Sequence, residues 1–332
     1  MTNDSSKKLT QEMVWQFIEM GDPEFEIEAF RIRYQISAES SAFYMAISRL
    51  LSEKKLKRLG RGRYRRVAQV KPIKVFGRER KLPKEITFPR DFNTMDEILP
   101  AYDIIIREGD LILISGRSNY GKTALCMNFC GENIESHPVL MGNEYTTIDH
   151  EPAPRFMNRL DNMDWINWAN GDGEDKFVLL PVYADYAEHI MRDRINIVDW
   201  LNIDTGEFYL ISHVMEEIKR QLGKGIGIIA IQKAEGAMSG RGGQFTKDFA
   251  DVEILLDEYG EREIMLTMGK VKESTKKVSG RKFAFSIENG VKIVDFRELQ
   301  KCASCYGKGW KGMERCDDCG GTGFVNKPNE VY

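Results

Sequence analysis

The central part of the chain alternates short apolar runs with amphipathic stretches. Between residues 88 and 298, runs rich in Val, Ile and Leu are separated by segments in which apolar residues recur at helical spacing. Short strands that are apolar on both faces predict a largely parallel sheet covered by helices, and therefore an α/β fold. One covering helix is predicted over 211–225. The predicted strands span residues 110–116, 137–144, 177–183, 195–201, 225–232, 251–258 and 263–270.

The first 67 residues have a different pattern, which predicts a separate small domain. Apolar residues at intervals of three and four predict helices over 10–20, 25–34 and 37–56. Two short strand candidates, 56–59 and 63–67, flank the turn sequence Gly-Arg-Gly. Three helices followed by a hairpin resemble a winged helix-turn-helix domain.

In that family the third helix enters the major groove and the hairpin lies along the phosphates. The resemblance therefore implies duplex DNA as a partner, although many winged helices contact only proteins. The residues expected to face bases are Ser40, Ser41 and Tyr44, and those expected to contact the DNA backbone are Arg61, Arg63 and Arg65.

Charge is distributed unevenly along the chain. The net charge is −3, yet residues 54–84 contain fourteen Lys or Arg and a single acid, Glu79. Aromatic and aliphatic residues at strand-like intervals distinguish this block from a solvated tail, so it favours binding to a polyanion. Residues 68–87, which include the second half of this block, contain prolines and basic residues and are predicted to be a linker.

A glycine-rich sequence follows the first predicted strand of the core. It fits G-x-x-x-x-G-K-T, directly after a strand and before a predicted helix, which is the context of a phosphate-binding loop. Backbone N–H groups would surround the phosphates of ATP, the lysine would reach the β and γ phosphates, and the threonine hydroxyl would ligate Mg²⁺. The loop comprises Gly116, Arg117, Ser118, Asn119, Tyr120, Gly121, Lys122 and Thr123.

Three polar residues end other predicted strands and are candidates for the chemistry at this loop. Asp199, at the end of a strand beside the loop, is predicted to hold the Mg²⁺ water shell. Glu144 is predicted to orient or deprotonate the attacking water, and Gln232 to sense the γ-phosphate. Each residue also fits a plain strand end, so its assignment depends on the phosphate loop.

The ordered set of these motifs resembles the RecA-like ATPase core of DnaB-type hexameric helicases over roughly residues 88 to 290. The resemblance makes Glu144 the catalytic glutamate and implies a homo-oligomeric ring, with replication proteins as partners. Lys270 and Lys272 lie where such helicases place a basic pair that reaches a neighbour's γ-phosphate. The second member there is usually arginine, and lysine lacks its bidentate fork.

The segment 233–247, directly after Gln232, corresponds to the loop that lines the channel of RecA-like motors. Arg241 and Lys247 are therefore expected to contact single-stranded DNA, while a plain surface loop is the alternative. The helicase family usually has a helical primase-binding domain where this chain has a winged helix. The sequence therefore supports the prediction of ATP hydrolysis better than the prediction of unwinding.

The tail, residues 299–332, contains two C-x-x-C pairs: Cys302 with Cys305, and Cys316 with Cys319. Four thiolates at this spacing predict a structural Zn²⁺ site, and a redox C-x-x-C is the alternative. Each pair continues as C-x-x-C-x-G-x-G, which resembles the cysteine-rich repeat of DnaJ chaperones. In the chaperones this repeat occurs in a larger set, so two copies do not imply a chaperone function for this protein.

These observations predict a Mg²⁺-dependent ATPase that acts on DNA. A DnaB-like helicase or translocase of phage or mobile-element type is the first hypothesis. An initiator, helicase loader or regulator that ATP switches without unwinding is the second, and a filament-forming recombinase is the third. The polar N-terminus and the absence of an apolar run of about 18 residues predict a cytoplasmic protein without a membrane partner.

Overall fold

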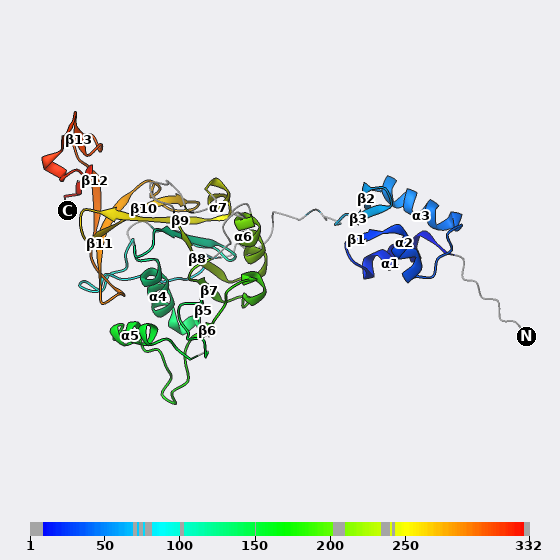
Figure 1. Cartoon of the computed structure of the whole chain (residues 1–332), viewed down its shortest axis with the longest axis horizontal. Helices are drawn as coiled ribbons and strands as arrows, with labels where there is room; N and C mark the ends of the chain where they lie inside the picture. Colours follow the sequence, from blue (N-terminus) through cyan, green and yellow to red (C-terminus); the bar gives the residue numbers. More distant parts are fainter. Residues whose placement is uncertain are drawn as a thin grey trace, which may run out of the picture. The chain divides into compact units, whose positions relative to one another are not determined.

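The structure is a computed structural model, and it describes residues 9–68, 72, 76, 82–99, 103–149, 151–201, 210–233, 240 and 243–328. The chain folds as two compact units, Met1–Arg80 and Lys81–Tyr332 (Figure 1). Among the described residues, no helix has both the length and the apolar character needed to cross a bilayer.

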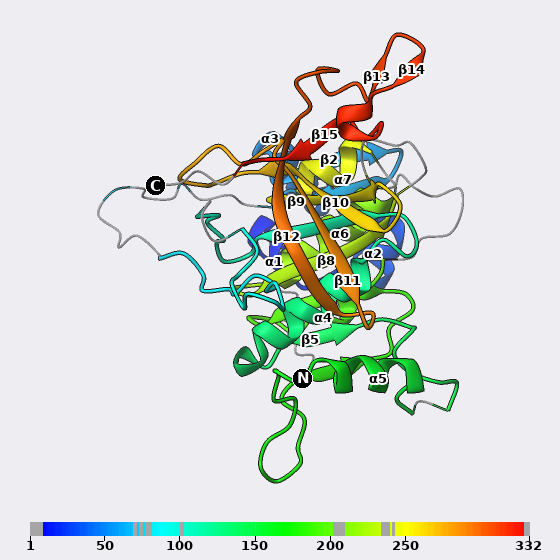
Figure 2. The same cartoon turned by 90° about the vertical axis from the view of Figure 1, so that its left-hand side faces the viewer.

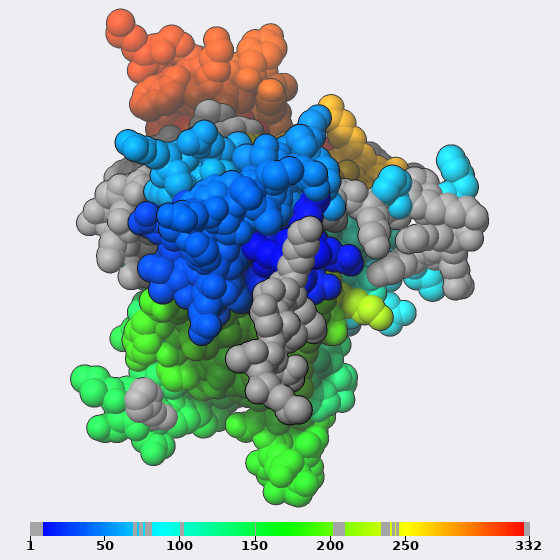
Figure 3. Space-filling view, turned by 90° about the vertical axis from the view of Figure 1, so that its right-hand side faces the viewer, coloured from blue at the N-terminus to red at the C-terminus, as the bar shows by residue number. Residues whose placement is uncertain are grey.

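The first unit contains three helices and a small antiparallel sheet with strand order β1-β3-β2. Two helices begin at capping hydroxyls: Thr10 Oγ1 accepts from the N–H of Met13, and Ser40 Oγ accepts from that of Phe43. Val14, Phe43 and Leu50 form its fully buried core, and Figure 3 shows the unit's surface in blue. Its elements are α1 (Gln11–Met20), β1 (Glu24–Glu26), α2 (Ile27–Arg33), α3 (Ser41–Ser52), β2 (Leu56–Gly60) and β3 (Arg63–Arg66).

The start of the second helix was predicted wrongly, because residues 24–26 form a strand and the helix begins at Ile27. Glu24 pairs with Arg65 and Glu26 with Arg63 across the β1–β3 ladder, and the ring of Phe25 lies 6.0 Å from that of Tyr64. Cross-strand ion pairs and ring packing therefore override the helical spacing of this segment.

The second unit is built on a ten-stranded sheet with order β15-β12-β11-β10-β9-β4-β8-β7-β5-β6. The six strands from β9 to β6 run parallel, and the others are antiparallel. The predicted α/β core with a mostly parallel, helix-flanked sheet is confirmed. The parallel strands are β4 (Leu111–Gly116), β5 (Val139–Met141), β6 (Val178–Leu180), β7 (Ile195–Val198), β8 (Ile226–Gln232) and β9 (Val252–Tyr259).

Helices cover both faces of this sheet. On β4, Ile112 and Ile114 pack with Leu125 and Phe129 of α4 on one face. On the other face, Leu113 belongs to a second cluster that includes Ile211 and Met215 of α6. The alternation of buried residues along β4 thus joins two cores. The helices are α4 (Lys122–Glu132), α5 (Pro154–Asn162), α6 (Leu210–Gln221) and α7 (Gln244–Phe249), with short 3-10 turns at Ile134–Ser136, Tyr186–His189 and Asp317–Cys319.

The antiparallel half of the sheet connects the core to the tail. The tail strand β15 (Phe324–Asn326) pairs with β12 (Lys292–Lys301), which pairs in turn with β11 (Lys282–Glu288) and then β10 (Glu263–Val271). Figure 2 shows β15 beside β12, below the small hairpin of β13 (Trp310–Lys311) and β14 (Glu314–Arg315). The sequence pattern set the tail apart, whereas β15 makes it the edge of the large sheet.

Candidate nucleotide site

The phosphate loop lies between β4 and α4, as its sequence context predicts. Gly116 ends β4, and Gly121 precedes α4 with φ +81°, a left-handed conformation that favours glycine. A Cβ atom at residue 121 would lie 2.5 Å from Cδ1 of Ile287 on β11. The second glycine is therefore required by both the backbone conformation and the close approach of the antiparallel strands.

Lys122 is the first residue of α4, and its ammonium folds back over the loop. Nζ donates to the carbonyl oxygens of Gly116 at 3.0 Å and Arg117 at 2.8 Å. Burial lowers the pKa of Lys122, while the negative charges of Asp199 and Glu144 oppose that change. The ammonium thus lies inside the loop with two carboxylates near enough to influence it.

Asp199 directly follows β7 and is buried beside the loop. Its Oδ2 accepts a hydrogen bond from the Tyr145 hydroxyl at 2.6 Å, and it also interacts with the Thr123 hydroxyl. Burial raises the pKa of Asp199, and these two hydrogen bonds and Lys122 act in the opposite direction. Strand β8 lies between β7 and β4, and the carboxylate of Asp199 still reaches the residues of the loop.

The remaining oxygen of Asp199 tests whether the site fits a magnesium ion. Oδ1 is buried and has no hydrogen-bond partner among the described residues. A carboxylate oxygen and a threonine hydroxyl are the hard oxygen ligands that Mg²⁺ takes together with phosphate and water. Asp199 and Thr123 therefore fit a magnesium site next to the phosphate loop.

Gln232 lies at the end of its strand, whereas the strand before Glu144 ends at Met141. Glu144 is exposed three residues after β5, and its charge acts on both Lys122 and Asp199. Gln232 ends β8, and its Nε2 donates to Ser118 Oγ of the phosphate loop at 3.0 Å. The structure thus brings Glu144, Asp199 and Gln232 to the phosphate loop from three different strands.

Sequence reasoning missed Tyr145 as a site residue. This fully buried side chain follows Glu144 and contacts Asp199 with its hydroxyl, while its ring packs 4.8 Å from that of Phe156 on α5. No motif marks a single tyrosine after a strand, so only its contact with Asp199 identifies it.

The other loop residues contact the neighbouring strand β9 or one another. The guanidinium of Arg117 lies 5.3 Å from the centre of the Tyr120 ring, and the Tyr120 hydroxyl donates to Glu258 of β9 at 3.2 Å. Asn119 has φ +67° and is exposed, as is Ser118. The loop is therefore held from the side of β9 and leaves polar groups at its surface.

The two lysines expected to reach a neighbouring subunit have partners in their own chain. Lys270 Nζ donates to the carbonyl oxygens of Lys247 and Asp248 on α7, at 2.9 and 3.2 Å. Lys272 Nζ lies 2.8 Å from Asp251 Oδ1. Lys247 itself lies 3.8 Å from Glu253, and Arg241 falls outside the described residues.

In the first unit, the residues expected to contact DNA fall into two groups. Ser41 and Tyr44 are exposed on α3, and the Tyr44 hydroxyl accepts from Arg31 at 3.2 Å, whereas Ser40 caps the helix.

The hairpin carries the second group. Arg63 and Arg65 each lie 3.9 Å from Glu24 of β1, and Arg61 is exposed in the turn. The acidic strand β1 therefore shares the surface of the hairpin's arginines, a feature that the sequence pattern alone did not indicate.

The four tail cysteines come together as the spacing predicts. Their Sγ atoms all lie within 4.8 Å of one another, with 3.9 Å between Cys302 and Cys316 and 3.7 Å between Cys305 and Cys319. A tetrahedral Zn²⁺ with bonds of about 2.3 Å places its sulfur ligands about 3.8 Å apart. Backbone N–H groups of Gly309 and Gly323 donate to Cys305 and Cys319. The cluster therefore fits a four-thiolate zinc ion.

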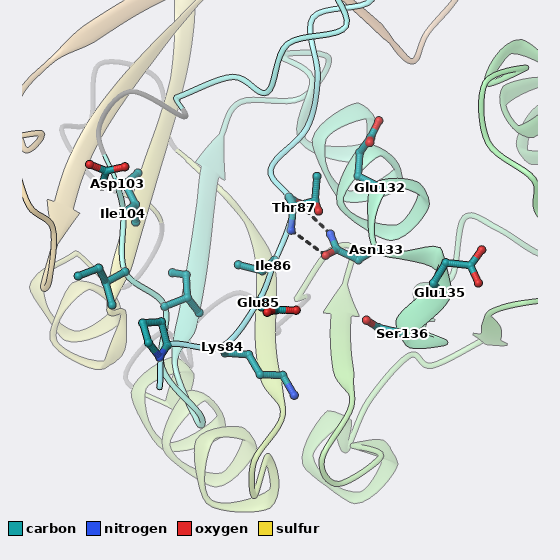
Figure 4. A pocket seen from close by; sticks show the side chains of 13 residues that line it. Lys84, Glu85, Ile86, Thr87, Asp103, Ile104, Glu132, Asn133, Glu135 and Ser136 are labelled. Atoms are coloured by element: carbon teal, nitrogen blue, oxygen red, sulfur yellow. Dashed lines mark hydrogen bonds between the residues drawn. The ribbon is translucent and has the colours of Figure 1, made fainter. Parts of the chain in front are cut away.

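A cavity of about 540 Å³ lies at the other end of α4 from the phosphate loop. Figure 4 shows Asn133 bonded to the backbone of Thr87 at its wall. Two of its carboxylates have partners: Glu132 binds Arg90, and Glu135 binds Lys176. These pairs stabilise the wall, so we do not place the nucleotide chemistry there.

Comparison with known proteins found no family model and no curated protein that matches the sequence. Among solved structures, the chain is similar to the KaiC-like protein PH0186 from the hyperthermophilic archaeon Pyrococcus horikoshii OT3. The TM-score is 0.44 and the sequence identity 16%, over 64% of this chain and 98% of that one. A likeness of this extent carries no functional argument. The fold is therefore assigned from the order of the strands, and the site from the geometry of its residues.

Proposed function

We propose that this protein is a Mg²⁺-dependent ATPase. The observation that carries the proposal is the convergence of Lys122, Thr123 and Asp199 at a glycine-rich loop between a buried strand and a helix. Neutral and apolar ligands would not require a buried ammonium and helix N–H groups at the same place, whereas a polyphosphate does.

The residues of the site divide the work of hydrolysis. Lys122 binds the β and γ phosphates, and Thr123 and Asp199 hold the ion. Mg²⁺, when bound, neutralises charge on the phosphate oxygens. Glu144 lies exposed near Lys122, where it orients the attacking water and accepts its proton. Gln232 links the state of the loop to the segment that follows it through its bond to Ser118.

The ATPase is proposed to act on DNA, as a DnaB-like helicase or translocase that works as a ring. Support comes from the exposed basic hairpin of the first unit and from the position of residues 233–247 directly after Gln232. In the ring, Lys270 and Lys272 would have to leave their present partners to reach a neighbour's phosphate. Replication proteins are the expected partners, and the cytoplasm is the expected compartment.

The second candidate is an ATP-switched initiator, loader or regulator without unwinding activity. The exposed face of α3 and the hairpin favour it, because a duplex-binding domain can mark a site on DNA while the core only changes its grip. A footprint on a defined duplex, without strand separation in the presence of ATP, would select this candidate.

The test is an ATPase assay on the full chain with and without single- and double-stranded DNA. Wild type is expected to hydrolyse ATP faster with single-stranded DNA, and Lys122→Ala to abolish hydrolysis while the thermal melt stays within a few degrees of wild type. Wild-type ATPase that ignores DNA contradicts the motor, and equal activity in Lys122→Ala contradicts the site itself. Size measurement with and without ATP tests the ring.

For the tail we propose one structural Zn²⁺ held by Cys302, Cys305, Cys316 and Cys319. Metal analysis of wild type is expected to give one zinc per chain, and the double variant Cys302→Ser/Cys316→Ser none. Ser304→Ala, within the same knuckle, serves as the control and should retain the metal. Absence of metal from wild type purified without chelator would favour the redox alternative.

A further inference from the structure

Glu253 is a buried carboxylate that the ATPase mechanism does not use. It lies on β9 opposite Leu113 of β4, and the residue is 1% exposed. Gly269 on β10 makes room for it, since a Cβ there would lie 2.2 Å from Oε2. Oε1 has no hydrogen-bond partner in the described part of the chain. A carboxylate buried in this way is costly unless cations balance it.

The charges of three lysines act on this carboxylate, Lys247 most strongly and then Lys270 and Lys233, and the three differ in how firmly they are held. Lys233 is buried and pairs with Asp257. Lys270 donates to two carbonyl oxygens at the end of α7. Lys247 lies 3.8 Å from Glu253 Oε2, which is too long for a hydrogen bond, and 39% of its side chain is exposed. Lys247 is therefore the cation that an incoming phosphate can reach most easily.

The position of Lys247 connects this ion pair to the nucleotide site. The segment 233–247 begins at Lys233, whose N–H donates to the carbonyl of Gly116 in the phosphate loop at 3.0 Å. It ends at Lys247, which is held by the carboxylate on the strand next to β4. Both ends of the segment are thus attached to the strand that carries the phosphate loop or to its neighbour.

We propose that Glu253 competes with a nucleic-acid phosphate for the Lys247 ammonium, and so limits how tightly the core holds single-stranded DNA. The inference rests on the proposed contact between residues 233–247 and DNA. When a phosphate takes Lys247, Glu253 stays buried and loses the counter-ion that lies 3.8 Å from it. The free energy needed to separate Lys247 from the buried carboxylate of Glu253 opposes DNA binding, and so keeps the binding reversible.

The test compares full-length variants for binding of a fluorescent oligo(dT) by anisotropy over a range of NaCl concentrations. Glu253→Gln keeps the shape and removes the charge, and is expected to tighten binding about three- to tenfold. The dependence of log affinity on log salt should steepen by up to about 0.7, the value for one phosphate contact on a single strand. Asp257→Asn is the matched control, because the lysine that it releases, Lys233, has a side chain that is only 4% exposed.

The double variant Glu253→Gln/Lys247→Met should lose the gain, and a gain that persists in it would overturn the competition. Binding by Glu253→Gln equal to wild type, with weaker binding by Lys247→Met, would also overturn it while leaving the DNA contact intact. Lys247→Met that binds like wild type contradicts the DNA contact itself, and with it the inference. If Glu253→Gln fails to fold, Glu253→Asp withdraws the carboxylate by one methylene and should tighten binding less.

Discussion

Tyr145→Phe isolates a single hydrogen bond at the candidate nucleotide site. The substitution removes the hydroxyl that donates to Asp199 Oδ2 at 2.6 Å and leaves a ring of nearly the same shape against Phe156. The bond favours the charged form of Asp199, so its loss should raise the pKa of that carboxyl further. We expect weaker binding of Mg²⁺ and an ATPase that requires more of the ion.

The size of the effect follows from the charge on the acceptor. A hydrogen bond to a charged group contributes about 1.5–3 kcal/mol, and removal of this donor leaves Oδ2 without its buried partner. If the whole contribution favours the ionised, metal-binding form, the Mg²⁺ concentration for half-maximal ATPase rises about tenfold to a hundredfold. The acid limb of the pH–rate profile should move to higher pH, because protonation of Asp199 begins at higher pH in the variant.

The assay is steady-state ATP hydrolysis at saturating ATP, titrated with Mg²⁺ at several pH values. Tyr306→Phe is the matched control, because that tyrosine is 82% exposed in the tail. A folded Tyr145→Phe protein with the same Mg²⁺ requirement and the same pH profile as wild type would refute the assignment of Asp199 to the metal.

Three further changes test other parts of the core. Gly121→Ala should weaken ATP binding at least tenfold in equilibrium titration, because φ is +81° and the new methyl group meets Ile287. The control Gly173→Ala has φ +87° and open space around it, and should bind ATP as wild type does. Gln232→Ala should keep basal ATP hydrolysis within about threefold of wild type but lose the stimulation of hydrolysis by DNA, since the bond to Ser118 contributes about 0.5–1.5 kcal/mol. Unchanged stimulation would exclude Gln232 as the link between the phosphate loop and the segment that follows it. Asp251→Asn should lower the free energy of unfolding by about 1.5–3 kcal/mol in urea melts, because it removes the charged acceptor of Lys219, Lys272 and the N–H of Leu111. Burial opposes ionisation of Asp251, yet the bonds from these lysines hold its pKa below the usual range. The stability that Asp251 contributes is therefore present near neutral pH and is lost as pH falls below about 4. A variant with the acid stability of wild type would contradict this.

The sequence predicted the core well where one physical rule dominates. Residues 226–231 include no polar side chain and are all buried, as expected for a strand covered on both faces of a sheet, so β8 and its parallel neighbours were found. The phosphate loop and the four cysteines were found because phosphate and zinc chemistry impose strict spacing. Contacts between distant residues follow no such local rule, and Tyr145 with Asp199 is the clearest case.

The errors have physical causes that can be named. The segment 24–26 carries a helical pattern, but it becomes a strand because β3 offers Arg63 and Arg65 opposite Glu26 and Glu24. Strands β11 and β12 were not among the predicted strands, since neither is apolar throughout and each ends in an exposed charged residue, Glu288 and Lys301. A local sequence pattern does not show which distant strand a segment will pair with.

The tail and the phosphate loop are closer in structure than their separation in sequence indicates. Strand β15 pairs with β12 at Leu299, Gln300 and Lys301, and β12 pairs with β11 along most of its length. Ile287, near the end of β11, is the residue that closes over Gly121. Strand β15, next to the cysteine cluster, therefore covers part of the edge of the β11–β12 hairpin, at the end opposite to the Ile287–Ile293 pair. The tail is therefore better understood as the border of the ten-stranded sheet than as an appended module.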